Sequence, residues 1–303
     1  MPRNGSDIRR RTMQRKRIMH FGTWNVQGIS RKMDEVLYEI NKLEIDLAVL
    51  TEIKKKSQGS ENLGMYDYFY SGVPKEKRAG QGVAILIHRK HRKYITTWEG
   101  ISERIIKINM NIRGYRLTII GVYAVNDDSP TASKDTFFQQ LNDEIIKTGK
   151  TREIFLLGDL NSRTGKSDND VTIGKYGEET LNNNGERLID MCKQNNLRIL
   201  NGFYQHRNIH KYTWTQDTKK IRSIIDYVIT KQKTKIQIQD VRVYRGAICG
   251  SDHHLLKAKI FLPYKREKIE YKEIENVTKE IEERRYNLTA LEDPACKCYT
   301  EKD

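Results

Sequence analysis

The segment Glu153–Asn161, with the sequence EIFLLGDLN, joins a run of apolar residues to a polar turn. Its first part, Glu153–Leu157, has the length and the bulky apolar side chains of a buried strand. Asp159 and Asn161 follow, two positions apart, where this strand ends. A carboxylate and an amide placed in this way can share one water molecule, the carboxylate as base and the amide as orienting group. The segment therefore predicts a buried strand with two candidate catalytic side chains, Asp159 and Asn161, at its carboxyl end.

The same alternation of apolar runs and polar turns extends from about residue 18 to residue 262. Helix-like runs with one apolar face lie at Met33–Leu43, Lys134–Thr148 and Gly185–Gln194. The strand-like runs are His20–Val26, Leu47–Ile53, Gly82–His88, Ile105–Ile112, Arg116–Tyr123, Glu153–Leu157, Arg198–Asn201, Ile224–Thr230, Val241–Tyr244 and Leu255–Phe261. Many strands in one continuous stretch, with few helices between them, favour two packed sheets with helices outside. We therefore expect a single α+β domain over residues 18–262.

The composition limits the class of protein. The chain has 303 residues, with 55 Lys and Arg against 40 Asp and Glu, and a net charge of +15. It lacks the run of about 18 apolar residues that a membrane span needs, and its basic N-terminal region lacks the apolar core of a secretory signal. Four cysteines are too few for a disulfide scaffold. We expect an intracellular protein, nuclear or cytoplasmic, with no membrane association and no obligate protein partner evident.

The positive charge is unevenly distributed along the chain. Residues 1–17 carry about +6 without hydrophobic periodicity, which predicts a disordered basic arm that either grips phosphates or acts as a nuclear signal. Residues 18–262 carry most of the remaining excess. Residues 263–303 are slightly acidic and have apolar residues at roughly helical spacing, which predicts a charged helical tail. Such a charge by itself favours a polyanionic partner, either nucleic acid or an anionic membrane surface.

Asp226 is the most informative single carboxylate. It lies between the apolar pairs Ile224-Ile225 and Val228-Ile229. An ionised carboxylate in such surroundings is costly unless it is paired. His253 is a candidate partner, and an imidazole held by a buried carboxylate can stay protonated and brace a phosphoryl oxygen.

Other polar residues at strand ends supply the remaining chemistry. Glu52, Asn25 and Asp252 offer hard oxygen ligands, which suit Mg²⁺, with Mn²⁺ as the alternative, better than zinc. Lys54 follows Glu52 closely and is a candidate phosphate contact. A metal ion, a positioned water and a nearby cation together are what phosphodiester hydrolysis requires.

Taken in order, these motifs resemble the endonuclease/exonuclease/phosphatase superfamily, which includes deoxyribonuclease I and the exonuclease-III-type apurinic endonucleases. The resemblance covers about residues 18–262 and implies a four-layer α/β/β/α sandwich of two packed mixed sheets with outer helices. A narrower resemblance is carried by the segments Thr23–Gly28, Asn184–Leu188, Tyr212–Thr215, Cys249–His253 and Leu255–Lys259. In these segments the chain resembles the endonuclease domains of non-LTR retrotransposons of the RTE/BovB kind and the craniofacial-development-protein-2-like proteins derived from them. The motifs that carry the superfamily resemblance are Trp24-Asn25, Thr51-Glu52, Val122-Tyr123, Gly158-Asp159-Leu160-Asn161, Ile225-Asp226-Tyr227 and Ser251-Asp252-His253.

The resemblance implies a role for each matching residue. Glu52 is implied as the main metal ligand, with Asn25 and Asp252 nearby. Asp159 is implied to position or deprotonate the attacking water, and Asn161 to help hold that water and the phosphate. The other implied roles are contact with the scissile phosphate for Tyr123, stabilisation of developing charge for His253 held by Asp226, and lining of the phosphate side of the cleft for Thr213 and Ser223.

These expectations converge on a Mg²⁺-dependent endonuclease that nicks one DNA strand and leaves a 3′-hydroxyl and a 5′-phosphate. No Tyr-X-Asp-Asp polymerase signature is present, so we expect an endonuclease module alone, with residues 263–303 as the remnant of a linker to an absent reverse transcriptase. The alternatives are an apurinic-site repair endonuclease, an inositol phosphatase or sphingomyelinase relative, and a domesticated, non-catalytic DNA- or chromatin-binding protein. Gln27 stands where apurinic endonucleases often carry an aspartate, which disfavours the repair reading.

Overall fold

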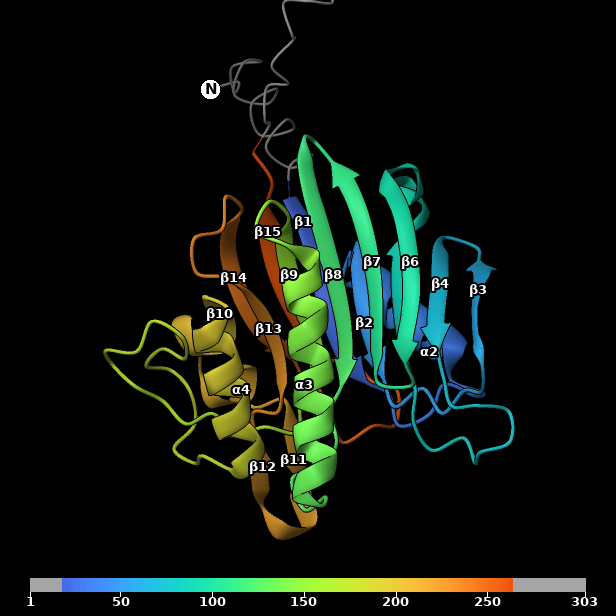
Figure 1. Ribbon diagram of the computed structural model, residues 1–303. Coiled ribbons are helices and arrows are strands. Elements are labelled where there is room, and N and C mark those ends of the chain that lie inside the picture. The colour runs from blue at the N-terminus through green and yellow to red at the C-terminus, as the bar shows by residue number, and fades with distance from the viewer. Residues whose placement is uncertain (1–17, 264–303) are drawn as a thin grey trace, which may run out of the picture. The chain divides into compact units, whose positions relative to one another are not determined.

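The computed structural model describes residues 18–263 (Figure 1). The predicted basic arm at residues 1–17 and the predicted tail beyond residue 263 lie outside the described residues. Among the described residues, no helix combines the length and the apolar character needed to cross a lipid bilayer.

The first sheet has seven strands in the order β14-β15-β1-β2-β5-β4-β3. Strands β1 and β2 are parallel, and the other neighbours are antiparallel, so the sheet is mixed. The strand bounds are β1 (Ile18–Asn25), β2 (Leu47–Thr51), β3 (Gln58–Leu63), β4 (Tyr66–Ser71), β5 (Val83–His88), β14 (Gln237–Tyr244) and β15 (Leu255–Phe261).

The second sheet has six strands in the order β10-β13-β9-β8-β7-β6, and β8 and β9 form its parallel pair. A separate two-stranded hairpin, β11-β12, extends beyond the edge of the sandwich (Figure 1). The bounds are β6 (Ile95–Ser102), β7 (Ile105–Ile112), β8 (Tyr115–Tyr123), β9 (Glu153–Asp159), β10 (Leu197–Ile199), β11 (Trp214–Gln216), β12 (Ile221–Ser223) and β13 (Asp226–Lys231).

Three apolar clusters hold four layers together. One lies between the sheets, where Phe21 of the first meets Phe155 of the second edge to face. The helix α2 (Met33–Lys42) packs its apolar face against the first sheet, and α3 (Thr131–Thr148) and α4 (Asn183–Gln194) cover the second (Figure 1). The predicted four-layer sandwich of two mixed sheets is thereby confirmed.

The two edge strands β3 and β6 had no counterpart among the strand-like runs of the sequence. Their side chains are mostly exposed or half-buried. A strand at the edge of a sheet with solvated side chains needs no apolar alternation, and that alternation is the signal by which strands are recognised from sequence. Backbone pairing with β4 and β7 therefore defines β3 and β6 more than their composition does.

The parallel pairs determine where polar strand ends gather. Strands β1 and β2 run side by side, so their carboxyl ends, Asn25 and Thr51, lie in register. Strands β8 and β9 are also parallel neighbours, and their carboxyl ends, Tyr123 and Asp159, lie in register. The side chain of Asn25 donates to the carboxylate of Asp159, so both pairs end at the same edge of the sandwich.

A buried carboxylate anchors the opposite end of β1 and β2. Asp46 is 4% exposed and accepts hydrogen bonds from the backbone N–H of His20 and from the side chain of His91, with Lys90 as a further ion-pair partner. Burial alone would raise the pKa of Asp46, but these partners hold it well below its usual 3.8, at about 2.

We predict that Asp46→Asn lowers the free energy of unfolding by about 2 kcal/mol at pH 7. Because the pKa is lower in the folded state, the stabilisation is present above the unfolded-state pKa of about 4 and is lost as the pH falls toward 2. Urea titrations of both proteins at several pH values measure the difference, which should shrink below about pH 4. A difference that stays constant down to pH 2 would contradict this account.

Candidate active site

Three predicted site residues lie in adjacent positions across the second sheet. In the ladder of β9 with β13, Asp159 pairs with Asp226, and in the ladder of β8 with β9, Tyr123 pairs with Asp159. Backbone pairing thus places the three side chains in one row at the carboxyl ends of β8 and β9. Asp159 and Asp226 are buried, with 1% and 0% exposure.

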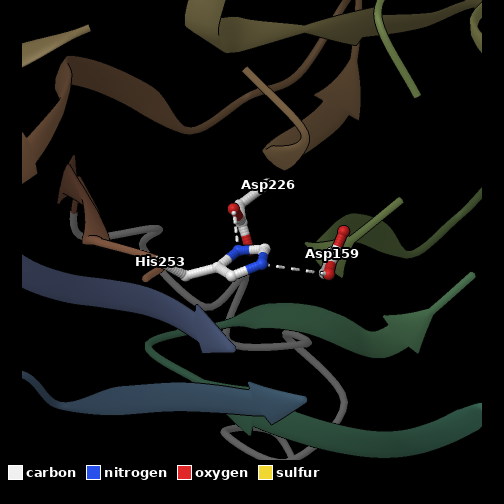
Figure 2. A group of neighbouring side chains, drawn as sticks. All are labelled: Asp159, Asp226 and His253. Atoms are coloured by element: carbon white, nitrogen blue, oxygen red, sulfur yellow. Dashed lines mark hydrogen bonds and ion pairs between the residues drawn. The ribbon is translucent and has the colours of Figure 1, made fainter. Parts of the chain in front are cut away.

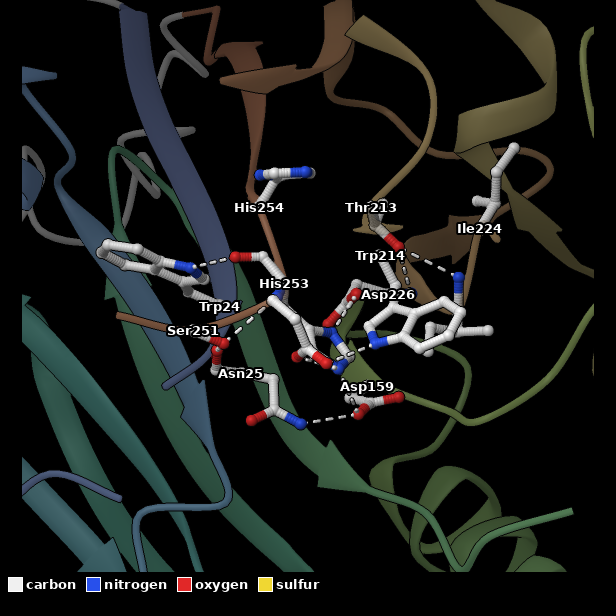
Figure 3. A network of polar contacts seen from close by, with 12 residues as sticks. Trp24, Asn25, Asp159, Thr213, Trp214, Ile224, Asp226, Ser251, His253 and His254 are labelled. Carbon is white, nitrogen blue, oxygen red and sulfur yellow. Dashed lines mark hydrogen bonds and ion pairs between the residues drawn. The ribbon is translucent and has the colours of Figure 1, made fainter. Parts of the chain in front are cut away.

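His253 lies between the two buried carboxylates (Figure 2). Its Nδ1 atom is 2.9 Å from Oδ2 of Asp226, and its Nε2 atom is 3.9 Å from Oδ2 of Asp159. The backbone on either side of the ring is tied to the first sheet, because Trp24 donates to the His253 carbonyl and Ser251 accepts from the His253 N–H (Figure 3). The ring therefore has a defined position between the two sheets.

The surrounding charges determine the protonation of this group. Burial alone would lower the pKa of His253, but Asp226 first, and then Asp159 and Asp252, raise it to about 9. Burial and repulsion by Asp226 raise the pKa of Asp159. At neutral pH the imidazole is therefore a cation, and Asp159 is a stronger base than an exposed aspartate.

Asp159 is held through both of its carboxylate oxygens. Asn25 donates to Oδ2 at 2.9 Å, and the backbone N–H of Asn161 donates to Oδ1 at 3.0 Å. The side chain of Asn161 donates to the carbonyl of Ala124, just beyond β8. These contacts orient the carboxylate before any substrate arrives, which is the condition for efficient proton transfer.

Four residues around the site have a strained backbone. Gln27, Glu52, Lys54 and Asn161 have φ angles of 49°, 53°, 52° and 45°, in the left-handed region that side chains other than glycine seldom adopt. Strain of this kind persists where the surrounding structure holds the chain firmly, and functional sites are frequent locations. The predicted metal ligand Glu52 is thus held on a tight turn directly after β2.

The predicted metal ligands offer suitable donor atoms. Oδ2 of Asp252 accepts from the indole N–H of Trp214 at 2.9 Å, whereas Oδ1 is buried without a hydrogen-bond partner among residues 18–263. Glu52 pairs with Lys54 at 3.1 Å, so a cation already faces this carboxylate. Oδ1 of Asp252 lies 3.9 Å from Nε2 of His253, and this oxygen, the Glu52 carboxylate and the Asn25 amide oxygen are hard donors of the kind that suits a divalent cation such as Mg²⁺.

A second group of potential ligand atoms comes from Asp159, Asp226 and His253, which lie within 4.8 Å of one another. Their geometry is that of a hydrogen-bonded group, since Nδ1 of His253 is engaged by Asp226. A protonated imidazole does not coordinate a metal ion. The donor set of Glu52, Asn25 and Asp252 is therefore the better candidate for the metal.

The structure gives Thr213, Ser223 and Lys54 specific surroundings. Thr213 is fully buried, and its hydroxyl accepts from the backbone N–H groups of Ile225 and Asp226 at 3.0 and 3.1 Å. Ser223 is 5% exposed and pairs with Trp214 in the β11-β12 hairpin. Thr213 therefore holds the backbone that carries Asp226, while Lys54, with a side chain 40% exposed, is the most accessible of the three.

Two further residues contact the site: Arg104, which lies in no predicted motif, and Trp214, which lies in the segment Tyr212–Thr215 that resembles the retrotransposon endonucleases. Arg104, in the turn between β6 and β7, donates to the carbonyls of Tyr123 and Ala124, and its guanidinium lies 5.2 Å from the centre of the Tyr123 ring. Trp214 reaches Asp252 from the hairpin. Both contacts arise from strand pairing between distant segments, so no local spacing in the sequence reveals them.

The two-sheet sandwich, with Asp159, Asp226 and His253 buried together at one edge, defines the class of fold. The model of the Endonuclease/Exonuclease/phosphatase family matches residues 22–253, and the chain belongs to this family. The family's members hydrolyse phosphodiester bonds, and its nucleases typically use divalent metal ions.

The chain is also similar to individual proteins, both in sequence and in fold. The chain is 31% identical over 245 residues to craniofacial development protein 2 of Bos taurus, covering 80% of this chain and 41% of that protein. It thus spans about two fifths of the length of this curated relative. Among solved structures, it is similar in fold to the endonuclease domain of TRAS1, a telomere-specific non-LTR retrotransposon, with a TM-score of 0.59, 18% identity, and coverage of 81% of this chain and 99% of that domain. The AP endonuclease LMAP from Leishmania major gives a TM-score of 0.63 at 14% identity, with 87% and 92% coverage.

We predict that Thr213→Val destabilises the protein by about 1–3 kcal/mol, because two buried N–H groups lose their acceptor while the side-chain shape is kept. Thr213→Ser keeps the hydroxyl and is the matched control, with an expected loss of about 1 kcal/mol or less. Chemical denaturation of the three proteins tests this. A valine variant as stable as the serine variant would show that the hydroxyl does not hold the start of β13.

Proposed function

We propose that this protein is a Mg²⁺-dependent DNA endonuclease of retrotransposon origin, which nicks one strand and leaves a 3′-hydroxyl and a 5′-phosphate. One observation carries the proposal: a protonated His253 lies between the buried carboxylates of Asp226 and Asp159, beside the oxygen donors of Asp252 and Asn25. This arrangement supports the roles of base, cation and metal ligands at one edge of the sandwich, which is the set that hydrolysis of a phosphodiester requires.

In the proposed mechanism, Asp159 accepts a proton from the attacking water. Its raised pKa brings its basicity closer to neutral pH, where proton transfer is most efficient. Asn161 helps to orient that water and the phosphate. The water oxygen forms a bond to phosphorus, the bond between phosphorus and the 3′ oxygen breaks, and the 3′ oxygen takes up a proton from solvent, so the products carry the 3′-hydroxyl and the 5′-phosphate.

The same site has two groups that stabilise the charge developing on the phosphate. His253, kept protonated by Asp226, presents a cation. Burial, followed by the nearby carboxylates of Glu52 and Asp159, raises the pKa of Tyr123, so its phenol stays protonated and can donate a hydrogen bond. Fixed donors of this kind stabilise a transition state without rearrangement at the moment of reaction.

Glu52, Asn25 and Asp252 are the residues that would hold Mg²⁺. A bound ion would supply Lewis-acid stabilisation of the phosphate oxygens. Without it, the exposed cation nearest to Glu52 is the ammonium group of Lys54, at 3.1 Å. With a divalent ion held at Glu52, Lys54 would be released from this pair and would be free to contact a DNA phosphate.

DNA is the proposed substrate for two reasons. The net charge of +15 suits a long polyanion better than a small phosphorylated headgroup. The similarity to craniofacial development protein 2 and the fold shared with the TRAS1 endonuclease domain both support the retrotransposon branch of the family.

We predict that the purified chain relaxes supercoiled plasmid in the presence of Mg²⁺ and that EDTA abolishes this activity. Asp159→Ala and His253→Ala should each lower the nicking rate by about 10²–10⁴-fold, since each removes a base or a charge-stabilising group. Asp190→Ala, an exposed aspartate on α4, is the matched control and should nick at the wild-type rate. Undiminished nicking by the Asp159→Ala protein would refute the mechanism.

The substrate is tested with two matched duplex oligonucleotides, one intact and one with a single abasic site. We predict similar nicking rates on both, because Gln27 replaces the aspartate often found in apurinic endonucleases. Strong preference for the abasic strand would establish a repair endonuclease instead. Tight DNA binding by the wild-type chain with no nicking of either duplex would establish a domesticated, non-catalytic DNA-binding protein.

A further inference from the structure

An open groove adjoins the proposed active site on the side of Tyr123. It has a volume of about 620 Å³, within the range of about 300–1,000 Å³ typical of small-ligand sites. Its walls come from the turn before β7, from the first turns of α3 and from Gln81, which precedes β5. The groove therefore lies between three segments that are distant in sequence.

Arg104 connects this groove to the site. It lines the groove, and its guanidinium donates to the carbonyls of Tyr123 and Ala124 at 3.2 and 3.0 Å. Val125, the next residue along the chain, also lines the groove. A molecule in the groove would thus lie against the segment that directly follows the phosphate-contacting tyrosine of the proposed mechanism.

The polar groups of the groove suit an uncharged heterocycle better than a phosphate. Arg104 and Glu103 are the only charged residues that line it among residues 18–263, and their charges cancel. The amides of Gln81 and Gln140 and the hydroxyl of Thr136 supply neutral donors and acceptors. Glutamine amides pair with the edges of nucleobases, whereas phosphates need a surplus of positive charge.

Gln81 provides an independent indication of a ligand. Its side-chain oxygen is buried and has no hydrogen-bond partner among the described residues. A buried acceptor left unpaired is costly, and native proteins seldom retain one without a reason. Gln81 lines the groove, so a rotation of its side chain that exposes this oxygen would let it accept from an N–H group of a nucleobase placed there.

We propose that this groove binds the base of a nucleotide next to the scissile phosphodiester bond, and that Gln81 and Gln140 read that base. The inference rests on the proposed endonuclease function and adds to it a source of target-site preference. In this arrangement the phosphate of the same nucleotide lies toward Tyr123. The segment Tyr123–Val125, which Arg104 holds through the carbonyls of Tyr123 and Ala124, then links the base-binding groove to the site of cleavage.

The first test measures nick positions on a duplex library of randomised sequence. The wild-type chain should show a base preference at one position beside the nick. Gln81→Ala and Gln140→Ala should each weaken that preference by about fivefold or more, measured as the ratio of nicks at the preferred base to nicks at the other bases. Gln139→Ala is the matched control, because Gln139 is exposed on the same helix and bonds to Asp143. Nicking with no base preference, or with a preference unchanged in both variants, would overturn the proposal while leaving the endonuclease function intact.

A second measurement is independent of catalysis. The His253→Ala chain is mixed with duplexes that carry 4-thiothymidine at successive positions, irradiated, and mapped by mass spectrometry. Crosslinks to Gln81 or to residues 132–140 are expected, and crosslinks confined to other segments would refute occupation of the groove by a base. If the wild-type chain crosslinks in the groove yet never nicks DNA, the proposed function fails and the groove remains a nucleotide-binding site.

Discussion

The imidazole of His253, placed between the carboxylates of Asp226 and Asp159, is the contact on which the rest of the site depends. Three ionisable groups are buried together, and such a cluster is stable only if charges and hydrogen bonds compensate one another. One imidazolium cannot neutralise two carboxylates. The remaining compensation comes from fixed dipoles, with Asn25 and the Asn161 N–H donating to Asp159. The polar residues around the site are therefore needed to stabilise the buried charges as well as to take part in the proposed reaction.

The sandwich supplies the rigidity that this cluster needs. Asp159 and Asp226 are neighbours on hydrogen-bonded strands of one sheet, while Asn25 ends a strand of the other. His253 is tied to the first sheet through Trp24 and to the second through Asp226. A shift of one sheet against the other would break these contacts together, so interior packing and site geometry are linked.

Most of the fold could be predicted from the sequence, because the buried strands carry their own signal. Ile105–Ile112 and Leu255–Phe261 are strands over the same residues in sequence pattern and in structure. The solvated edge strands β3 and β6 lack that signal, and only pairing with neighbours defines them. The close contact of Asp226 with His253 was also predictable, since an isolated carboxylate among isoleucines needs a partner.

The sequence by itself determined the layered fold, the family and the set of polar residues at strand ends, because local composition and motif order carry that information. The tertiary structure alone decided how those residues are used. The hydroxyl of Thr213 accepts a hydrogen bond from the backbone N–H of Asp226. The indole of Trp214 donates to the carboxylate of Asp252, and the guanidinium of Arg104 donates to the carbonyl of Tyr123. Each of these contacts joins segments separated along the chain, and hydrogen bonds across such separations depend on strand register and packing. The groove beside Tyr123 has the same origin, since three distant segments form its walls.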